Sequence, residues 1–213
     1  MITRFKDRID GGKKLAVLLA SYKNNPNTIV IGLPRGGVVT AYQVAYALNL
    51  PLDLVVPRKI SAPTSSELAV GALTQEGNIV WNEALLKQLG LTITDLADSV
   101  EKEKKESARR LSLYRGRRSL LNVKDKIVIL VDDGIATGAT MRAAIASVRA
   151  QGAKKIVVAI PVSSREALKK IKKEADEVVC VMVPEIFWGV GAFYDLFEQT
   201  KDEEVIELMK KAC

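Results

Sequence analysis

The chain has 213 residues, of which 48% are hydrophobic and 27% charged, a composition typical of a globular protein with one substantial core. It contains no histidine, which excludes Ser-His-Asp and Cys-His catalysis and histidine-ligated metals, so any metal would be held by oxygen, as Mg²⁺ is. The net charge is +7, the N-terminus lacks a signal peptide's apolar stretch, and the apolar runs are too short for a bilayer, so we expect a cytoplasmic protein with no membrane partner.

Apolar, β-branched runs alternate with helical patterns along most of the chain. Strands that are continuously apolar are buried on both faces, which indicates a parallel sheet covered by helices. The fold class is therefore α/β, with a doubly wound, mostly parallel sheet flanked by helices. We expect strands at 28–32, 53–57, 126–131, 155–161 and 177–183, and helices at about 11–23 and at 36–49, 139–152 and 164–175.

Two stretches interrupt this alternation. The first opens with the loop-like sequence SAPTSSE (61–67), continues through a candidate hairpin (69–81) and ends in polar helices. The second is rich in aromatic residues and, with the N-terminal helix, would form a small hood lobe over the sheet. We expect a single domain over 1–213, with a core at about 24–60 and 124–183, an insertion with a flexible loop and helices at about 61–123, and a hood from about 1–23 and 184–213.

Most of the positive charge lies in one segment. Residues 101–126 carry ten Lys or Arg against four Asp or Glu, a net of +6. A basic field attracts phosphates or nucleic acid, but the signs here mix along an expected helix, which is typical of a solvated face. We favour the solvated face and do not expect nucleic acid as a partner, although the sequence leaves the role of the segment open.

Two adjacent carboxylates follow one of the most apolar strands. Asp132 and Asp133 come at the edge where open α/β sheets bind ligands. The turn after them leads into a helix, so its backbone N–H groups and the helix dipole would bind an anion. Carboxylates pair well with hydroxyl groups, so a ligand with both a phosphate and a vicinal diol, such as ribose 5-phosphate, would satisfy both features. The turn residues assigned to the phosphate are Gly134, Ala136, Thr137, Gly138, Ala139 and Thr140.

The string VILVDDGIATGAT (128–140) resembles the 13-residue signature of type I phosphoribosyltransferases, with Ala139 where many members have a second glycine. The likeness spans nearly the whole chain, because four further segments are similar to those of a bacterial and archaeal branch of phosphoribosyltransferase-domain proteins. These segments are LPRGG (33–37), RKISAP (58–63), ELAVGA (67–72) and GAFYDLF (191–197). The resemblance implies a type I phosphoribosyltransferase-like fold and a transferase of nucleotide metabolism. Its donor would be 5-phosphoribosyl 1-pyrophosphate with Mg²⁺, and its acceptor a small, nucleobase-like nitrogen compound.

The resemblance also assigns roles to residues. Asp132 and Asp133 would hold the ribose hydroxyls and face the positive charge that develops in an oxocarbenium-like transition state. Arg35 and Lys59 would stabilise the departing pyrophosphate. No direct protein ligand to the metal is expected, since Mg²⁺ would arrive with the donor and lie near the two carboxylates. The residues assigned to pyrophosphate binding are Arg35, Gly36, Gly37, Arg58 and Lys59.

The acceptor is the open question. A mobile loop at 60–76 would close over the site and bring Glu67 to a ligand. Phe187, Trp188 and Tyr194 would stack on a flat base, although packing within the hood's own core is the slightly favoured alternative. Two other functions stay open, namely a non-catalytic regulator that binds phosphoribosyl pyrophosphate and a hydrolase of phosphoribosyl compounds. An apolar lobe surface is also compatible with a homodimer.

Overall fold

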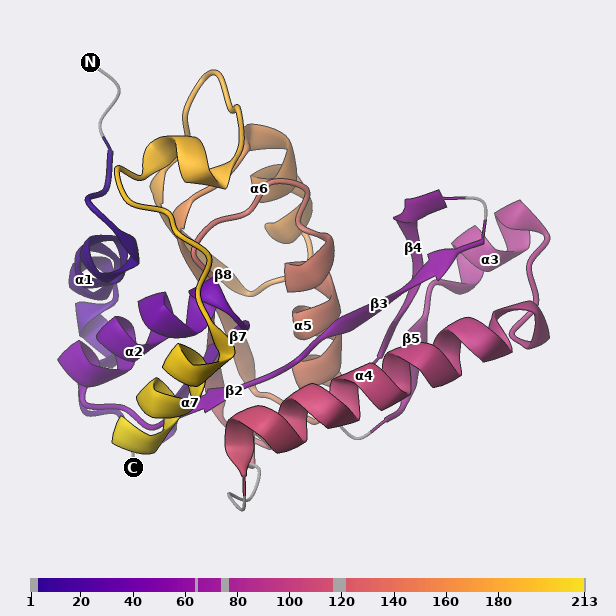
Figure 1. The fold of residues 1–213 in the computed structure, drawn as a ribbon, viewed down its shortest axis with the longest axis horizontal. Coiled ribbons are helices and arrows are strands. Elements are labelled where there is room, and N and C mark those ends of the chain that lie inside the picture. Colours follow the sequence, from indigo (N-terminus) through magenta and orange to yellow (C-terminus); the bar gives the residue numbers. More distant parts are fainter. Residues whose placement is uncertain (1–3, 64, 74–76, 117–121, 213) are drawn as a thin grey trace.

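The computed structural model describes residues 4–63, 65–73, 77–116 and 122–212, and Figure 1 shows their arrangement. The parallel sheet consists of β1 (Thr28–Gly32), β2 (Leu52–Leu54), β6 (Ile127–Val131), β7 (Lys155–Val162) and β8 (Glu177–Met182). A second, antiparallel sheet consists of β3 (Arg58–Ala62), β4 (Ser65–Leu73) and β5 (Ile79–Trp81). The α-helices are α1 (Arg8–Leu18), α2 (Gly36–Leu48), α3 (Glu83–Leu89), α4 (Ala97–Arg115), α5 (Ala139–Ala150), α6 (Arg165–Ile171) and α7 (Asp202–Lys211). Short 3₁₀ turns are η1 (Ala20–Tyr22), η2 (Thr94–Leu96) and η3 (Val190–Phe193).

The five-stranded sheet has the order β2-β1-β6-β7-β8, and each neighbouring pair is parallel. Helices cover both of its faces, so the predicted fold class is confirmed. Four of the five observed strands match the expected ones to within one residue at each end, because their apolar runs are short and bounded mainly by polar residues or glycine. The fifth, β2, covers Leu52–Leu54, so the strand expected at 53–57 begins one residue earlier and ends three residues sooner. The expected N-terminal helix begins earlier, at Arg8, since the Asp7 carboxylate caps it by accepting from the N–H of Asp10 at 2.8 Å.

Alternate residues of the sheet's strands contribute side chains to two separate hydrophobic cores, one on each face of the sheet. One face packs Val30, Ile129 and Val157 against α1 and α2, and the other packs Ile31, Leu130 and Val158 against α5 and α6. This division explains why the strands are mostly apolar, since burial on both faces disfavours polar side chains. Thr28 of β1 and Asp53 of β2 are buried exceptions. The two helical layers also fix where the helix N-termini lie, at the carboxyl edge of the sheet.

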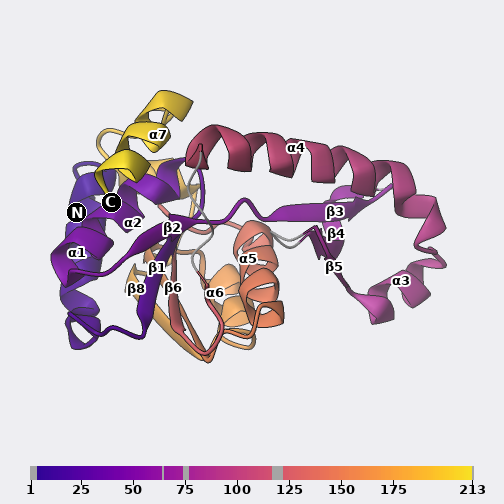
Figure 2. The same ribbon diagram turned by 90° about the horizontal axis from the view of Figure 1, so that it is seen from below.

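The antiparallel sheet projects from the core as an arm, together with α3 and the adjoining half of α4 (Figures 1 and 2). The helix α4 packs on β3 at one end and on α7 at the other, so it connects the arm to the core. The expected hairpin is present as the β4–β5 pair. The interpretation of 61–67 as a loop is wrong, because β3 extends to Ala62 and β4 begins at Ser65. The register between β3 and β4 shifts on both sides of Ser61, so the pairing is irregular there.

Another cluster of buried side chains forms the hood, which we define by Phe5, Val162, Phe193 and Tyr194. Phe5 pairs with Tyr194 in an isolated β-bridge, and both rings pack with Phe193 against the end of β7. The chain therefore brings its first described residues and residues 190–197 together over the carboxyl edge of the sheet (Figure 1). Among the helices that the structure describes, none is both long and apolar enough to cross a membrane.

Candidate active site

Three of the predicted segments meet at one edge of the parallel sheet. Gly32, the last residue of β1, pairs in register with Val131 and with Leu54, so these strands end together. A cavity of about 420 Å³ lies beyond this edge. Its lining comes from all three following segments and from α4: Pro34, Val56, Pro57, Arg58, Lys59, Ser61, Glu103, Arg110 and Thr140. The structure thus brings the glycine-rich, basic and phosphate-loop segments to a single recess.

The acidic pair lies directly against the glycines that open α2. A methyl group on Gly36 would come within 2.0 Å of Asp133 Oδ2, and one on Gly37 within 2.6 Å of Asp132 Oδ1. Real Cβ atoms do not approach so closely, so the carboxylates occupy the space that the missing side chains leave. The Pro34–Arg35 peptide bond before these glycines is cis. The close approach of two loops, rather than a positive φ, is why glycine is required at both positions.

Arg8 forms an ion pair with Asp133 that no sequence pattern predicts. The guanidinium Nε lies 2.7 Å from Asp133 Oδ2, and the two side chains are only 13% and 15% exposed. Arg8 is 125 residues away in the chain and belongs to none of the recognised motifs. The Tyr194 hydroxyl donates to the backbone carbonyl of Asp133 at 2.5 Å, so the hood holds this residue by its main chain as well.

Asp132 has a different environment. Its Oδ1 accepts from the N–H of Asp133 at 2.9 Å. Burial, and next the neighbouring negative charge of Asp133, raise the pKa of the Asp132 carboxyl well above its usual value. Two carboxylates of one motif are therefore unequal, since Asp133 carries a cationic partner at hydrogen-bond distance and Asp132 accepts from a backbone amide.

The turn after the acidic pair is held by β7 and its following residues. Ile135 N–H donates to the Val162 carbonyl at 2.9 Å, and the Ser164 hydroxyl donates to the Ala136 carbonyl at 2.7 Å. Gly138 has a φ of +84° and precedes the first residue of α5. The turn thus leads directly into the N-terminus of α5, where the first backbone N–H groups have no partner within the helix, and that of Ala139 donates to Thr137 Oγ1 at 3.5 Å. A helix N-terminus of this kind is suited to bind an anion.

The basic residues assigned to pyrophosphate are partly engaged by carboxylates. Arg35 Nη1 lies 3.8 Å from Asp202 Oδ1 of α7, and Tyr114 of α4 donates to the same oxygen at 2.6 Å. Arg58 is ion-paired with Glu103 of α4. Lys59 contributes to the wall of the 420 Å³ cavity. Arg58 and Lys59 therefore line the recess, whereas Arg35 follows its lining residue Pro34 in the chain. The helices α4 and α7 supply the acidic partners that sequence reasoning missed.

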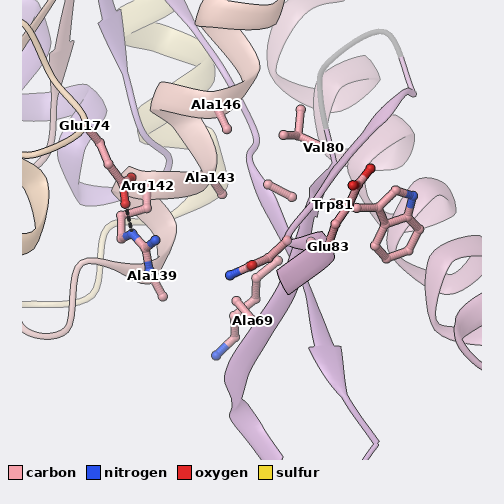
Figure 3. A pocket seen from close by; sticks show the side chains of 13 residues that line it. Ala69, Val80, Trp81, Glu83, Ala139, Arg142, Ala143, Ala146 and Glu174 are labelled. Atoms are coloured by element: carbon pink, nitrogen blue, oxygen red, sulfur yellow. Dashed lines mark hydrogen bonds and ion pairs between the residues drawn. The ribbon is translucent and has the colours of Figure 1, made fainter. Parts of the chain in front are cut away.

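Lys59 also borders a second cavity, of about 480 Å³, between the arm and α5. Its walls carry small side chains from both sides, among them Ala69 of the arm and Ala143 of α5 (Figure 3). An ion pair of 2.6 Å between Arg142 and Glu174 closes one end (Figure 3). The first residues of α5 border both cavities, since Ala139 lines this one and Thr140 lines the 420 Å³ recess.

The aromatic residues proposed for the acceptor occupy different environments. Tyr194 is 3% exposed and packs in the hood core, where Phe187 stacks on Phe193 at 5.6 Å. Trp188 is 68% exposed and lines an apolar cavity of about 580 Å³ beside β8, separate from the 420 Å³ recess. The geometry therefore gives no shared stacking surface for the three rings. The side chain of Glu67 lies outside the described residues.

Metal binding requires several ligating side chains to lie close together. Among the described residues, no group of three or more His, Cys, Asp or Glu side chains could hold a metal ion by itself. Mg²⁺ is commonly bound by one or two carboxylates together with the phosphates of a substrate. The two adjacent carboxylates that follow β6, Asp132 and Asp133, fit an ion of that kind.

The chain has three features of the type I phosphoribosyltransferase fold. They are a doubly wound sheet, an acidic pair after its central strand, and a glycine-rich turn before the next helix. A family model described as a phosphoribosyl transferase domain matches residues 1–197, so the chain belongs to this family.

Three known proteins are similar to the chain. A protein of Mycobacterium tuberculosis H37Rv, provisionally named a phosphoribosyl transferase, is 40% identical over 209 residues, which are 98% of this chain and 47% of that protein. The chain thus spans about half the length of the curated relatives it matches. The crystal structure of TT1426 from Thermus thermophilus has a TM-score of 0.91 and 39% identity, covering 98% of this chain and 99% of that one. A hypothetical protein of Neisseria gonorrhoeae, crystallised with ppGpp, shares the fold at a TM-score of 0.50 and 13% identity, covering 100% and 99% of the two chains.

Proposed function

We propose that the chain is a phosphoribosyltransferase that uses 5-phosphoribosyl 1-pyrophosphate with Mg²⁺ and transfers phosphoribose to a small nitrogen acceptor, releasing pyrophosphate. The observation that carries this proposal is that the acidic pair packs against Gly36 and Gly37 and precedes a turn whose Thr140 lines a cavity together with Arg58 and Lys59. A ligand with a diol between two phosphorylated ends matches this order of charges.

The proposed chemistry follows from these positions. Asp132 and Asp133 accept hydrogen bonds from the ribose hydroxyls, and the amides at the start of α5, with Thr137 and Thr140, bind the 5-phosphate. The bond between ribose C1 and the pyrophosphate oxygen breaks, and the oxygen keeps the electron pair. The acceptor nitrogen uses its lone pair to form the new bond to C1.

The charged groups act on the charges that develop during this step. The carboxylates stabilise the growing positive charge at C1, and Arg35 and Lys59 stabilise the negative charge on pyrophosphate. Bound Mg²⁺ supplies further neutralisation of the diphosphate oxygens. For Arg35 to contribute, its guanidinium must leave Asp202 and bind the diphosphate instead. The contact with Asp202 is weak, because the two groups are 3.8 Å apart, so little free energy is lost when it breaks.

Pyrophosphate release, screened across purines, pyrimidines and other nitrogen acceptors, tests the reaction. Release that depends on one acceptor supports the transferase. Release in water alone identifies a hydrolase, and donor binding without turnover identifies a regulator; either result contradicts the proposal. The acceptor's identity is the part of the function that this screen supplies.

Nucleic acid is not part of the proposal. Along α4, Arg109 and Arg110 are both paired with Glu106, and Lys104 lies 3.8 Å from Glu101. Much of the positive charge in the described part of this segment is therefore balanced locally. A cytoplasmic location and a homodimer remain proposals, the latter open to light scattering on the purified chain.

A further inference from the structure

Arg8 makes three contacts, one of them with the acidic pair, although the proposed chemistry does not use it. Besides its 2.7 Å contact with Asp133, Arg8 donates from Nη1 to the Glu198 carbonyl at 2.7 Å. Its guanidinium carbon lies 3.9 Å from the centre of the Phe197 ring. A planar guanidinium with a carboxylate, a carbonyl and an aromatic face as partners has little freedom to turn.

The arrangement restrains Asp133 from three sides. Arg8 holds Oδ2, Tyr194 holds the backbone carbonyl, and Gly36 leaves room for the carboxylate but for nothing more. The Arg8–Asp133 pair is largely shielded from water, so it is stronger than an exposed ion pair. These contacts therefore restrain the orientation of the Asp133 carboxylate.

The charge balance matters for a polyanionic donor. Two adjacent ionised carboxylates repel each other and also repel a ligand that carries a phosphate and a diphosphate. A cation at 2.7 Å offsets one of the two charges while leaving Asp133 able to accept from a hydroxyl. Without it, the acidic pair and the anion turn would act against each other.

We propose that Arg8 is a positioning residue, which orients and neutralises Asp133 so that the acidic pair can bind the ribose diol of a polyanionic donor. This inference rests on the proposed function. A purely structural role, in which Arg8 ties α1 to the sheet, is the competing explanation. The two differ in one respect: a positioning residue acts through Asp133, so its effect on donor binding disappears when Asp133 is already neutral.

The test is calorimetry with 5-phosphoribosyl 1-pyrophosphate and Mg²⁺ on the wild type, Arg8→Met, Arg8→Lys, Asp133→Asn and the Arg8→Met/Asp133→Asn double variant. Lys14→Met is the matched control, since Lys14 lies on the same helix and pairs with Asp10 at 2.8 Å, away from the acidic pair. Circular dichroism and melting temperatures establish that each variant folds. Should Arg8→Met not fold, Arg8→Gln carries the same comparison, because glutamine retains a donor without the charge.

We expect Arg8→Met to raise the dissociation constant about tenfold, in line with the loss of one hydrogen bond to a charged group. Arg8→Lys recovers much of this loss, Lys14→Met binds as the wild type does, and the double variant binds no more weakly than Asp133→Asn. Any of three results would overturn the inference. Arg8→Met could bind the donor as the wild type does, Arg8→Lys could recover none of the lost affinity, or Arg8→Met could weaken donor binding equally in the Asp133→Asn background. Wild-type protein that does not bind the donor overturns the proposed function, and this inference with it.

Discussion

The α-carbon of Gly36 and the carboxylate of Asp133 are so close that a single methyl group on Gly36 would lie 2.0 Å from Oδ2. The same methyl group would lie 2.6 Å from Arg8 Nε. The Arg8–Asp133 ion pair therefore has room beside Gly36 only because Gly36 has no side chain. The two motifs form one structural unit, although 97 positions separate them in the sequence.

Gly36→Ala should therefore displace the Arg8–Asp133 pair. We expect a loss of about 1–3 kcal/mol in the free energy of unfolding, as for other overpacked sites, and a weakened affinity for phosphoribosyl pyrophosphate. Urea denaturation and calorimetry measure the two effects. Ala47→Gly, an exposed position on the same helix, is the control; it should lose about 1 kcal/mol through helix propensity alone and bind normally. Unchanged donor affinity in Gly36→Ala would contradict the packing argument.

Asp132→Asn should stabilise the protein at neutral pH while impairing its binding. A carboxyl whose pKa is raised in the folded state favours folding below its ordinary value of 3.8, and this contribution is lost as the pH rises through the folded value. Asparagine does not ionise, so the melting temperature of the variant should exceed that of the wild type by a margin that grows from pH 4 to pH 8, to on the order of 2–5 °C. Asp195→Asn, an exposed carboxyl, is the control. A margin that is constant or shrinks with pH would contradict the assigned environment.

Lys59→Met should weaken the binding of inorganic pyrophosphate, because Lys59 lines the recess beyond β1 and β6. We expect a loss of about tenfold, since one charge-assisted contact to phosphate is removed. Lys104→Met, which removes a partly exposed lysine of α4 paired with Glu101, should leave the affinity unchanged. Equal affinities of the two variants, measured by calorimetry, would move the pyrophosphate site elsewhere.

Asp202→Asn should tighten donor binding about twofold to fivefold, since Arg35 would no longer have to leave a carboxylate. Glu203→Gln is a matched control, because both acidic residues lie in the first turn of α7 and interact with the same helix dipole. Tighter binding in both variants would show that the general charge of α7 matters, not the contact with Arg35. Weaker binding in Asp202→Asn would mean that Asp202 holds Arg35 in its useful position.

Local sequence patterns predicted the parallel sheet because each strand is a short apolar run with polar or glycine boundaries. The position of the turn between β6 and α5 was equally predictable, since its glycine, its threonines and the preceding carboxylates are contiguous; its assignment to a phosphate stays a prediction. The loop interpretation of 61–67 failed because serine and proline indicate turns only locally, whereas pairing between Ser61 and Ala69 is decided by the arm as a whole.

The missed residues share a different cause. Arg8 contacts Asp133, and Asp202 contacts Arg35, across 125 and 167 positions, and both look like ordinary surface charges in their own segments. No periodicity or motif marks such a residue, because its role depends on which loops the fold brings together. The glycines of 36–37 gave the one available signal, since paired glycines at a helix start indicate a close approach by some other group.

The central claim is that one ligand presents its diol to the acidic pair and its phosphate to the turn before α5. A crystal structure of the protein with 5-phosphoribosyl 1-pyrophosphate and Mg²⁺ tests this most directly. We predict both ribose hydroxyls within hydrogen-bond distance of Asp132 and Asp133, the 5-phosphate on the amides of residues 136–140, and the Arg8–Asp133 pair intact. A ribose away from the carboxylates, or a diphosphate in the turn, would contradict the account.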